Sequence, residues 1–168
     1  MTIALKGGKE LEQFLSAFPA KLQKGAVRAG VTAAAKVLRT EARLQAPKDT
    51  GKFAKSIRSS SSRVNQDGTV SIRVFVDRKK PHGWLGPMIE YGIAPHDITI
   101  KPGKAGKLGD EFVSGTISHP GVVAQPFLRP ALDLKAGEAI EAFGVRIRDY
   151  LKDKTGFSAP VLEVDNAA

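Results

Sequence analysis

The fold is decided by residues 20–46, which read AKLQKGAVRAGVTAAAKVLRTEARLQA. Apolar side chains recur there at steps of three and four residues, at Val27, Val31, Ala34, Leu38 and Ala42. This spacing places them on one face of an α-helix, and small neighbours such as Ala26, Ala29 and Ala33 widen that face. Pro19 suits the first turn of such a helix, and no further proline occurs before Pro47. The stretch therefore predicts a long amphipathic helix that packs closely against another element.

A second long helix is predicted over residues 126–154. One of its faces would carry Leu128, Leu132, Ala136, Ala139, Phe143, Ile147 and Tyr150. Pro126 opens this helix and Gly156 is a natural stop, because glycine readily adopts the left-handed conformation that ends helices. We expect it to pack against the helix over residues 20–46 and to be followed by a tail over residues 155–168.

Between the two helices the periodicity changes from helical to alternating. Val70, Ile72, Val74 and Val76 alternate with other residues, which indicates a half-buried strand. Asp67-Gly68 is a strong hairpin signal, so residues 57–65 should form the antiparallel partner, with serines 59–62 exposed or at an edge. Shorter elements are expected at residues 9–18 (helix), 53–57 (one turn), 87–92 (ordered segment) and 97–101 (a third strand).

The segment over residues 101–121 contains five glycines, which predicts a long mobile loop or a hairpin arm. The expected fold class is thus α+β: a small antiparallel sheet packed against two long helices, 20–46 and 126–154, with an arm. We expect residues 1–154 to form one domain, because a chain of 168 residues is long enough for a single core.

Composition narrows the function classes. With 42% apolar and 26% charged residues, the chain is typical of folded proteins rather than disordered ones. The absence of cysteine excludes disulfides, thiolate metal sites and cysteine nucleophiles. No apolar run approaches the roughly 20 residues of a membrane span, and residues 1–6 do not resemble a signal peptide. We expect synthesis in the cytoplasm.

The net charge of +9 lies entirely in the N-terminal half of the chain. On the helix over residues 20–46 the cations gather on about a third of the circumference, at Lys21, Lys24, Arg28, Lys36, Arg39 and Arg43. Three interpretations remain open: a solvated helix face, contact with DNA, or contact with a less basic face of a neighbouring subunit. No aromatic residues interleave with these cations, so base-specific reading of DNA is poorly supported.

Chemistry-bearing motifs are few. His82, His96 and His119 lie in or beside predicted loops without metal-ligand spacing, and loop polarity is their simplest interpretation. There is no phosphate-binding glycine loop, dinucleotide fingerprint or nucleophile elbow. The acidic pair Asp110-Glu111 lies in the glycine-rich segment, where rigid catalytic geometry is hard to hold. We therefore expect no catalytic residues, no cofactor and no metal.

Three short signatures occur in order along the chain. They are residues 46–53 (APKDTGKF) with Ser56-Ile57, residues 89–92 (IEYG), and residues 125–131 (QPFLRPA). Together with Gly7-Gly8 and the alanine-rich helix, they resemble the neck and tail-completion family of bacteriophages with long non-contractile tails. The resemblance covers about residues 5–151, and it identifies as fold or interface positions Pro47, Thr50, Gly51, Glu90, Tyr91, Gly92, Pro126, Phe127, Arg129 and Pro130.

The resemblance implies a structural virion protein. Such a protein would form a homo-oligomeric ring in the neck, between the connector and the tail tube, with DNA passing through its lumen. Its partners would be other copies of itself, a connector or head-closure protein, and a tail-terminator or tail-tube protein. We expect inter-subunit or DNA-facing contacts at Arg28, Arg39, Arg43, Arg78, Lys79 and Lys80. A tail-terminator ring and a basic DNA-binding protein remain the alternatives. The simplest reading of the three signatures themselves is turn, cap and core within one chain.

Overall fold

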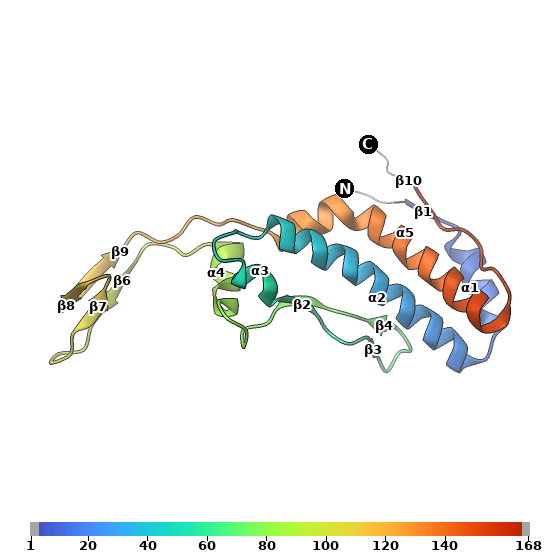
Figure 1. Ribbon diagram of the computed structural model, residues 1–168, viewed down its shortest axis with the longest axis horizontal. Coiled ribbons are helices and arrows are strands. Elements are labelled where there is room, and N and C mark those ends of the chain that lie inside the picture. The colour runs from blue at the N-terminus through green and yellow to red at the C-terminus, as the bar shows by residue number, and fades with distance from the viewer. Residues whose placement is uncertain (1–3, 166–168) are drawn as a thin grey trace.

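Two long antiparallel helices form the body of the protein in the computed structural model, which describes residues 4–165 (Figure 1). Helix α2 spans Ala20–Gln45 and helix α5 spans Leu128–Thr155, and they contact each other along their length. The predicted pair of helices is confirmed. The second begins two residues later than expected, at Leu128, because Phe127 has a non-helical φ of −132°. Gly156 ends it with a φ of 77°, as predicted.

Glycines on α2 let the two helices approach closely. A Cβ atom built on Gly30 would lie 2.7 Å from Cδ2 of Phe143 and 2.9 Å from Cγ1 of Ile147. A Cβ on Gly25 would overlap the Tyr150 hydroxyl. Gly30 is buried and Ile147 is fully buried, so this crossing lies at the centre of one half of the core. The small residues of the predicted stripe thus pack closely, as their size indicates.

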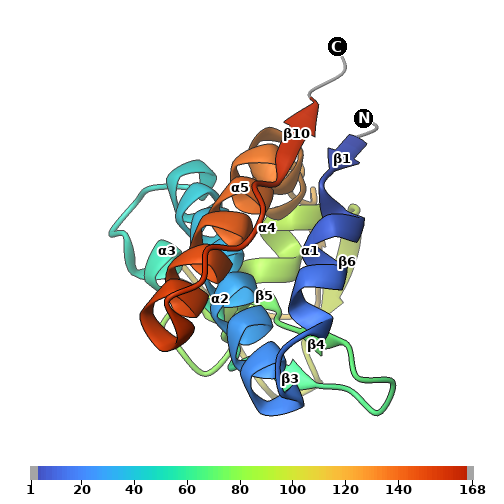
Figure 2. The same cartoon turned by 90° about the vertical axis from the view of Figure 1, so that its right-hand side faces the viewer.

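The two ends of the described chain meet beside the helix pair. Helix α1 (Gly8–Ser16) lies against α2, and strand β1 (Ala4–Lys6) pairs antiparallel with β10 (Glu163–Asp165) (Figure 2). Leu11 of α1 and Leu162 of the tail share one core cluster with Ala26, Ile147 and Leu151. This β1–β10 pair was not among the elements expected from the sequence, and the last three residues of the predicted tail lie outside the described range.

The predicted hairpin runs beside α2. Strand β2 (Ile57–Ser59) pairs with β5 (Val74–Val76), and β3 (Arg63–Val64) pairs with β4 (Val70–Ser71), both antiparallel. The expected strands are interrupted at 60–62 and 72–73. At this point the Ser60 hydroxyl, in place of a backbone carbonyl, accepts the Arg73 backbone N–H at 3.0 Å. Helix α3 (Lys52–Ser56) precedes this hairpin, and the 3₁₀ turn η1 (Gly83–Leu85) and helix α4 (Gly86–Tyr91) follow it.

Residues 93–122 form an arm that projects from the body (Figure 1). Its base is the bridge between Ile93 and Val122. Strand β6 (His96–Thr99) pairs with β9 (Thr116–His119), and β7 (Gly106–Leu108) pairs with β8 (Glu111–Val113). The third strand expected at 97–101 therefore exists as β6 but belongs to the arm, and the hairpin arm expected over 101–121 begins eight residues earlier.

Candidate functional site

The three sequence signatures, far apart in the chain, meet at the base of the arm. Phe127 is completely buried, and its ring makes an edge-to-face contact with Phe53, with ring centroids 5.3 Å apart. Phe53 is held by α3, which starts where Gly51 adopts a left-handed φ of 70°. Glu90, on α4, is 5% exposed and reaches the first turn of α5. We call Phe53, Glu90 and Phe127, with their contacts, the arm junction.

Glu90 caps helix α5 from another element. Its carboxylate accepts the backbone N–H groups of Phe127 (2.9 Å), Leu128 (3.0 Å) and Arg129 (3.3 Å). These donors belong to the helix start, where backbone N–H groups have no partner within the helix and where the helix dipole favours a negative charge. No side chain at the N-cap position itself, Phe127, can do this. A 28-residue helix is therefore capped from α4.

Electrostatics at Glu90 favour the charged form. Burial raises its pKa, but the backbone donors Leu128, Phe127 and Arg129, together with the charge of Arg129, outweigh burial and hold the pKa below the usual range of a glutamate. The guanidinium of Arg129 lies 3.8 Å from the carboxylate and 5.2 Å above the Tyr91 ring. Because the Arg129 side chain is 68% exposed, its ion pair adds less than the backbone hydrogen bonds do.

The backbone around Gly92 and Gln125 joins the arm to the body. The Gln125 N–H donates to the Ile89 carbonyl at 2.8 Å, and Ile93 and Val122 exchange two hydrogen bonds of 2.9 Å. Gly92 has a φ of 72°, and a Cβ atom there would lie 2.7 Å from the Val122 carbonyl oxygen. Glycine is therefore required here, where the chain leaves α4 and passes close to the Val122 carbonyl at the base of the arm. The junction fixes where the arm leaves the body.

The other signature positions surround the junction less tightly. Pro47 and Gly51 are partly exposed, and Thr50 and Pro126 are exposed. Pro130 occupies the first turn of α5, where its missing N–H costs nothing. The structure thus brings together Glu90, Phe127 and Arg129 with Tyr91 and Gly92 nearby, while Thr50 and Pro126 have exposed side chains.

Two of the predicted basic contacts are used within the chain. Arg43 Nε donates to the Ile57 carbonyl at 2.9 Å, and Arg39 donates to the Ser59 hydroxyl at 3.1 Å, so both hold strand β2 against α2. Burial, followed by the charges of Arg39 and Arg58, lowers the pKa of Arg43 below its ordinary value. A role of these two arginines between subunits or toward DNA stays a prediction.

A third arginine of the stripe lines a basic hollow between α2 and the hairpin. Arg28 faces it together with Arg63 and Arg73, and the hollow has a volume of about 740 Å³. The rest of its lining consists of Ser60, Ser61, Ser62, Val64, Asn65, Ser71 and Ile72. Arg63 and Arg73 were not singled out from the sequence, although they flank the predicted turn on opposite strands. Arg78, Lys79 and Lys80 occupy a separate exposed turn, where the Asp77 carboxylate accepts the Lys79 N–H at 3.1 Å.

Two histidines come together in the arm. His96 and His119 face each other across β6 and β9, with ring centroids 5.0 Å apart. His96 Nδ1 lies 3.0 Å from the Ala94 carbonyl, and His119 Nδ1 accepts the Gly121 N–H at 3.0 Å. Within residues 4–165 no group of three or more histidine, aspartate or glutamate side chains is arranged to hold a metal ion.

Over the same range, no helix is both long and apolar enough to cross a membrane.

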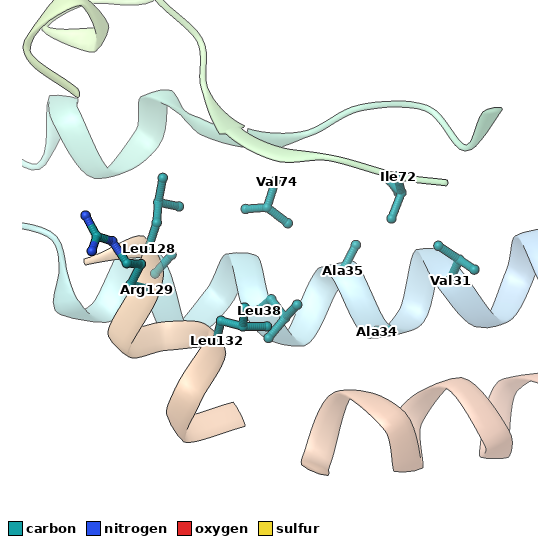
Figure 3. Close-up of a pocket in the computed structure, with 10 residues that line it drawn as sticks. Val31, Ala34, Ala35, Leu38, Ile72, Val74, Leu128, Arg129 and Leu132 are labelled. Carbon is teal, nitrogen blue, oxygen red and sulfur yellow. The ribbon is translucent and has the colours of Figure 1, made fainter. Parts of the chain in front are cut away.

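An apolar groove runs between α2, the start of α5 and the hairpin (Figure 3). It has a volume of about 360 Å³ and is lined by Val31, Ala34, Ala35, Leu38, Ala42, Ile72, Val74, Leu128, Arg129 and Leu132. A second hollow of about 380 Å³ continues it along α5 and shares Val31, Ala34, Leu38 and Leu132. We call the two hollows together the α2–α5 groove. The predicted apolar stripe of α2 is thus only partly covered by the chain's own elements.

The fold and its arm junction define a small α+β protein with a body of two long helices and a projecting arm. A family model described as "Bacteriophage HK97-gp10, putative tail-component" matches residues 9–92, which is half of the chain. The chain belongs to this family, and membership assigns it a structural role in the tail or neck of a bacteriophage particle. The matched residues include the first two signatures and end at Gly92, so the arm and α5 follow them. Searches of curated proteins and of solved structures gave no match.

Proposed function

We propose that the protein forms a homo-oligomeric ring in the phage neck, where it joins the capsid connector to the tail tube and lets DNA pass through the lumen. Membership of the tail-component family carries this proposal. The architecture supports it, because an arm anchored by a rigid junction on a helical body gives one subunit two separate surfaces for its neighbours. A head-to-tail contact between such surfaces closes a ring when its rotation is suitable.

The proposed role is structural, without a catalysed reaction. Its partners are further copies, a connector or head-closure protein, and a tail-terminator or tail-tube protein. The charge distribution supports contact between unlike faces, because the N-terminal half carries the whole positive excess while the C-terminal half is slightly acidic. The protein would assemble in the host cytoplasm and end in the virion.

Electron microscopy of lysates tests this role. The gene is interrupted in the phage or prophage that encodes it, and the intact gene is restored on a plasmid as the control. We expect filled heads without tails together with free tails, and normal particles on restoration. Intact tailed particles from the interrupted gene would overturn the proposal. Labelling the protein in whole particles separates a neck ring from a tail-terminator ring, since the two differ in position.

Contact with passing DNA is the second part of the proposal, and the basic hollow supports it. Arg28, Arg63 and Arg73 converge there, and among the described residues none of them forms an ion pair with a carboxylate. Arginines in such a hollow suit phosphate oxygens without reading sequence. Passage through a lumen requires weak contact, so we expect low affinity for the free subunit.

Charge reversal distinguishes a loss of DNA contact from a loss of folding. Replacing Arg28, Arg63 and Arg73 together by Glu should reduce infectious titre at least tenfold with an unchanged circular dichroism spectrum. Reversing the exposed lysines Lys48, Lys52 and Lys55 changes the net charge equally and serves as the control. Equal titres for both variants would show that the basic hollow does not contact the passing DNA. Tight binding of the free protein to DNA that weakens steeply with salt would instead favour a DNA-binding protein of another class.

A further inference from the structure

The α2–α5 groove is an apolar surface with room for an additional element. Val31, Ala34 and Leu38 lie on the predicted core face of α2, yet all three keep part of their surface exposed. Leu132, opposite them on α5, is 52% exposed. The part of the groove that follows α5 has no charged or polar residue in its lining. Arg129 is the one charged residue in the lining of the whole groove. An apolar groove next to a closely packed helix pair is typical of a docking site for apolar side chains.

The arm carries apolar side chains that its own chain leaves uncovered. Phe112 is 75% exposed, Val122 is 48% exposed and Ile98 is 42% exposed. The four arm strands pair with one another, and the arm points away from the helix pair (Figure 1). The arm junction fixes the base of the arm. Because the arm points away from the helix pair, it does not reach the α2–α5 groove of its own chain.

Charge favours a second copy as the partner of the arm. The arm, residues 93–122, carries three lysines against three acidic residues, whereas the whole chain carries +9. The whole positive excess therefore lies on the body, and a contact between its most basic faces is unfavourable. The neutral arm adds no net charge to a contact with a neighbouring body, and the groove that it meets there is apolar apart from Arg129 at the start of α5.

We propose that the arm of one copy lies in the α2–α5 groove of the next copy, with Phe112 as the main apolar anchor. This inference rests on the ring proposed above and names the contact that builds it. The arm strands have three or four residues, about 10–14 Å each, and the stretch of α2 that lines the groove, from Val31 to Ala42, is about 17 Å long. Because donor and acceptor surfaces differ, the contact is head-to-tail and propagates from copy to copy.

Cysteine cross-linking tests the contact directly, because the natural chain has no cysteine. Two full-length proteins are made, one with Phe112→Cys and one with Leu132→Cys, and a tag on one of them makes the mixed dimer distinguishable by size. Thr40→Cys is the control acceptor, because Thr40 is exposed and lies on the face of α2 opposite Leu38. Under mild oxidation we expect at least ten times more mixed dimer with Leu132→Cys than with Thr40→Cys. Equal yields, or no mixed dimer at any protein concentration up to about 100 µM, would overturn the proposal.

Association measured by sedimentation gives an independent readout. Phe112→Asp should weaken self-association by about thirtyfold, the loss expected for a central aromatic anchor. Leu134→Asp is the matched control, because Leu134 is 68% exposed on α5 but does not line the groove. Equal weakening by both variants would contradict the assignment. A specific cross-link combined with intact particles from the interrupted gene would overturn only the neck role, whereas tailless heads without the cross-link would overturn only the docking of the arm.

Discussion

Replacing Glu90 by Gln tests the arm junction most directly. The side chain keeps its size but loses the charge that the Phe127, Leu128 and Arg129 N–H groups surround. Hydrogen bonds to a charged group contribute about 1.5–3 kcal/mol, and the amide oxygen of Gln retains part of this. We expect Glu90→Gln to lower the free energy of unfolding by about 1.5 kcal/mol at pH 7, and Glu90→Ala by about 3 kcal/mol.

Urea unfolding followed by circular dichroism measures these losses, because most of the helical signal comes from α2 and α5. For a chain of this size, about 1.5 kcal/mol corresponds to a shift in Tm of roughly 4 °C. Glu138→Gln is the matched control, since Glu138 pairs with Lys135 on the exposed surface of the same helix. That variant should lose less than about 0.5 kcal/mol. A Glu90→Gln protein as stable as the control would refute the capping role.

The contribution of Glu90 to the free energy of unfolding should depend on pH. Because the pKa of Glu90 is lower in the folded protein than in the unfolded chain, the folded state binds fewer protons at this site. Its stabilisation is complete above the ordinary glutamate pKa of about 4.3 and is lost as the pH falls through the folded-state value. The difference between wild type and Glu90→Gln should therefore be constant near neutral pH and narrow below about pH 4. If the difference in unfolding free energy between wild type and Glu90→Gln stays the same down to pH 3, the lowered pKa of Glu90 is contradicted.

Three further variants test the packing and the arm. Phe127→Ala removes a completely buried ring beside Phe53 and should cost about 3–5 kcal/mol in urea unfolding; a loss below 1 kcal/mol would mean that the junction is not packed. Gly30→Val places side-chain atoms against Phe143 and should lower the free energy of unfolding by about 1–3 kcal/mol, again measured in urea. Ala33→Val, on the partly exposed side of α2, is the comparison and should lower it less. Replacing residues 94–121 by a short glycine-containing turn should leave the midpoint of body unfolding within a few degrees in a thermal scan, because the arm strands pair among themselves; loss of cooperative unfolding would show that the arm supports the body.

Local patterns were sufficient for the elements whose signals are periodic. The three- and four-residue spacing from Val27 to Ala42 predicted α2, and the alternation from Val70 to Val76 predicted the hairpin beside it. These predictions succeed because helix and strand periods are properties of neighbouring residues. The start of α5 was placed two residues early because its cap is Glu90, which lies 37 positions before Phe127.

The basic stripe shows where a local pattern stops being informative. Arg28, Arg39 and Arg43 share one helix face by spacing, and the sequence treats them alike. In the folded chain Arg39 and Arg43 hold strand β2, while Arg28 lines a hollow with Arg63 and Arg73. The difference depends on which strand packs beside each turn of α2, and a helical period carries no information about that.

The sequence by itself determined the two long helices, the hairpin, the glycine-rich arm and the three ordered signatures, because each rests on contacts or conformations of residues close in the chain. Only the tertiary structure decided that the three signatures meet at one junction, that β1 pairs with β10, and that the apolar stripe of α2 remains partly open. The physical reason is that caps, ring contacts and grooves join residues that are distant along the chain. Glu90 and Phe127 acquire their roles only when α4 is packed against the start of α5.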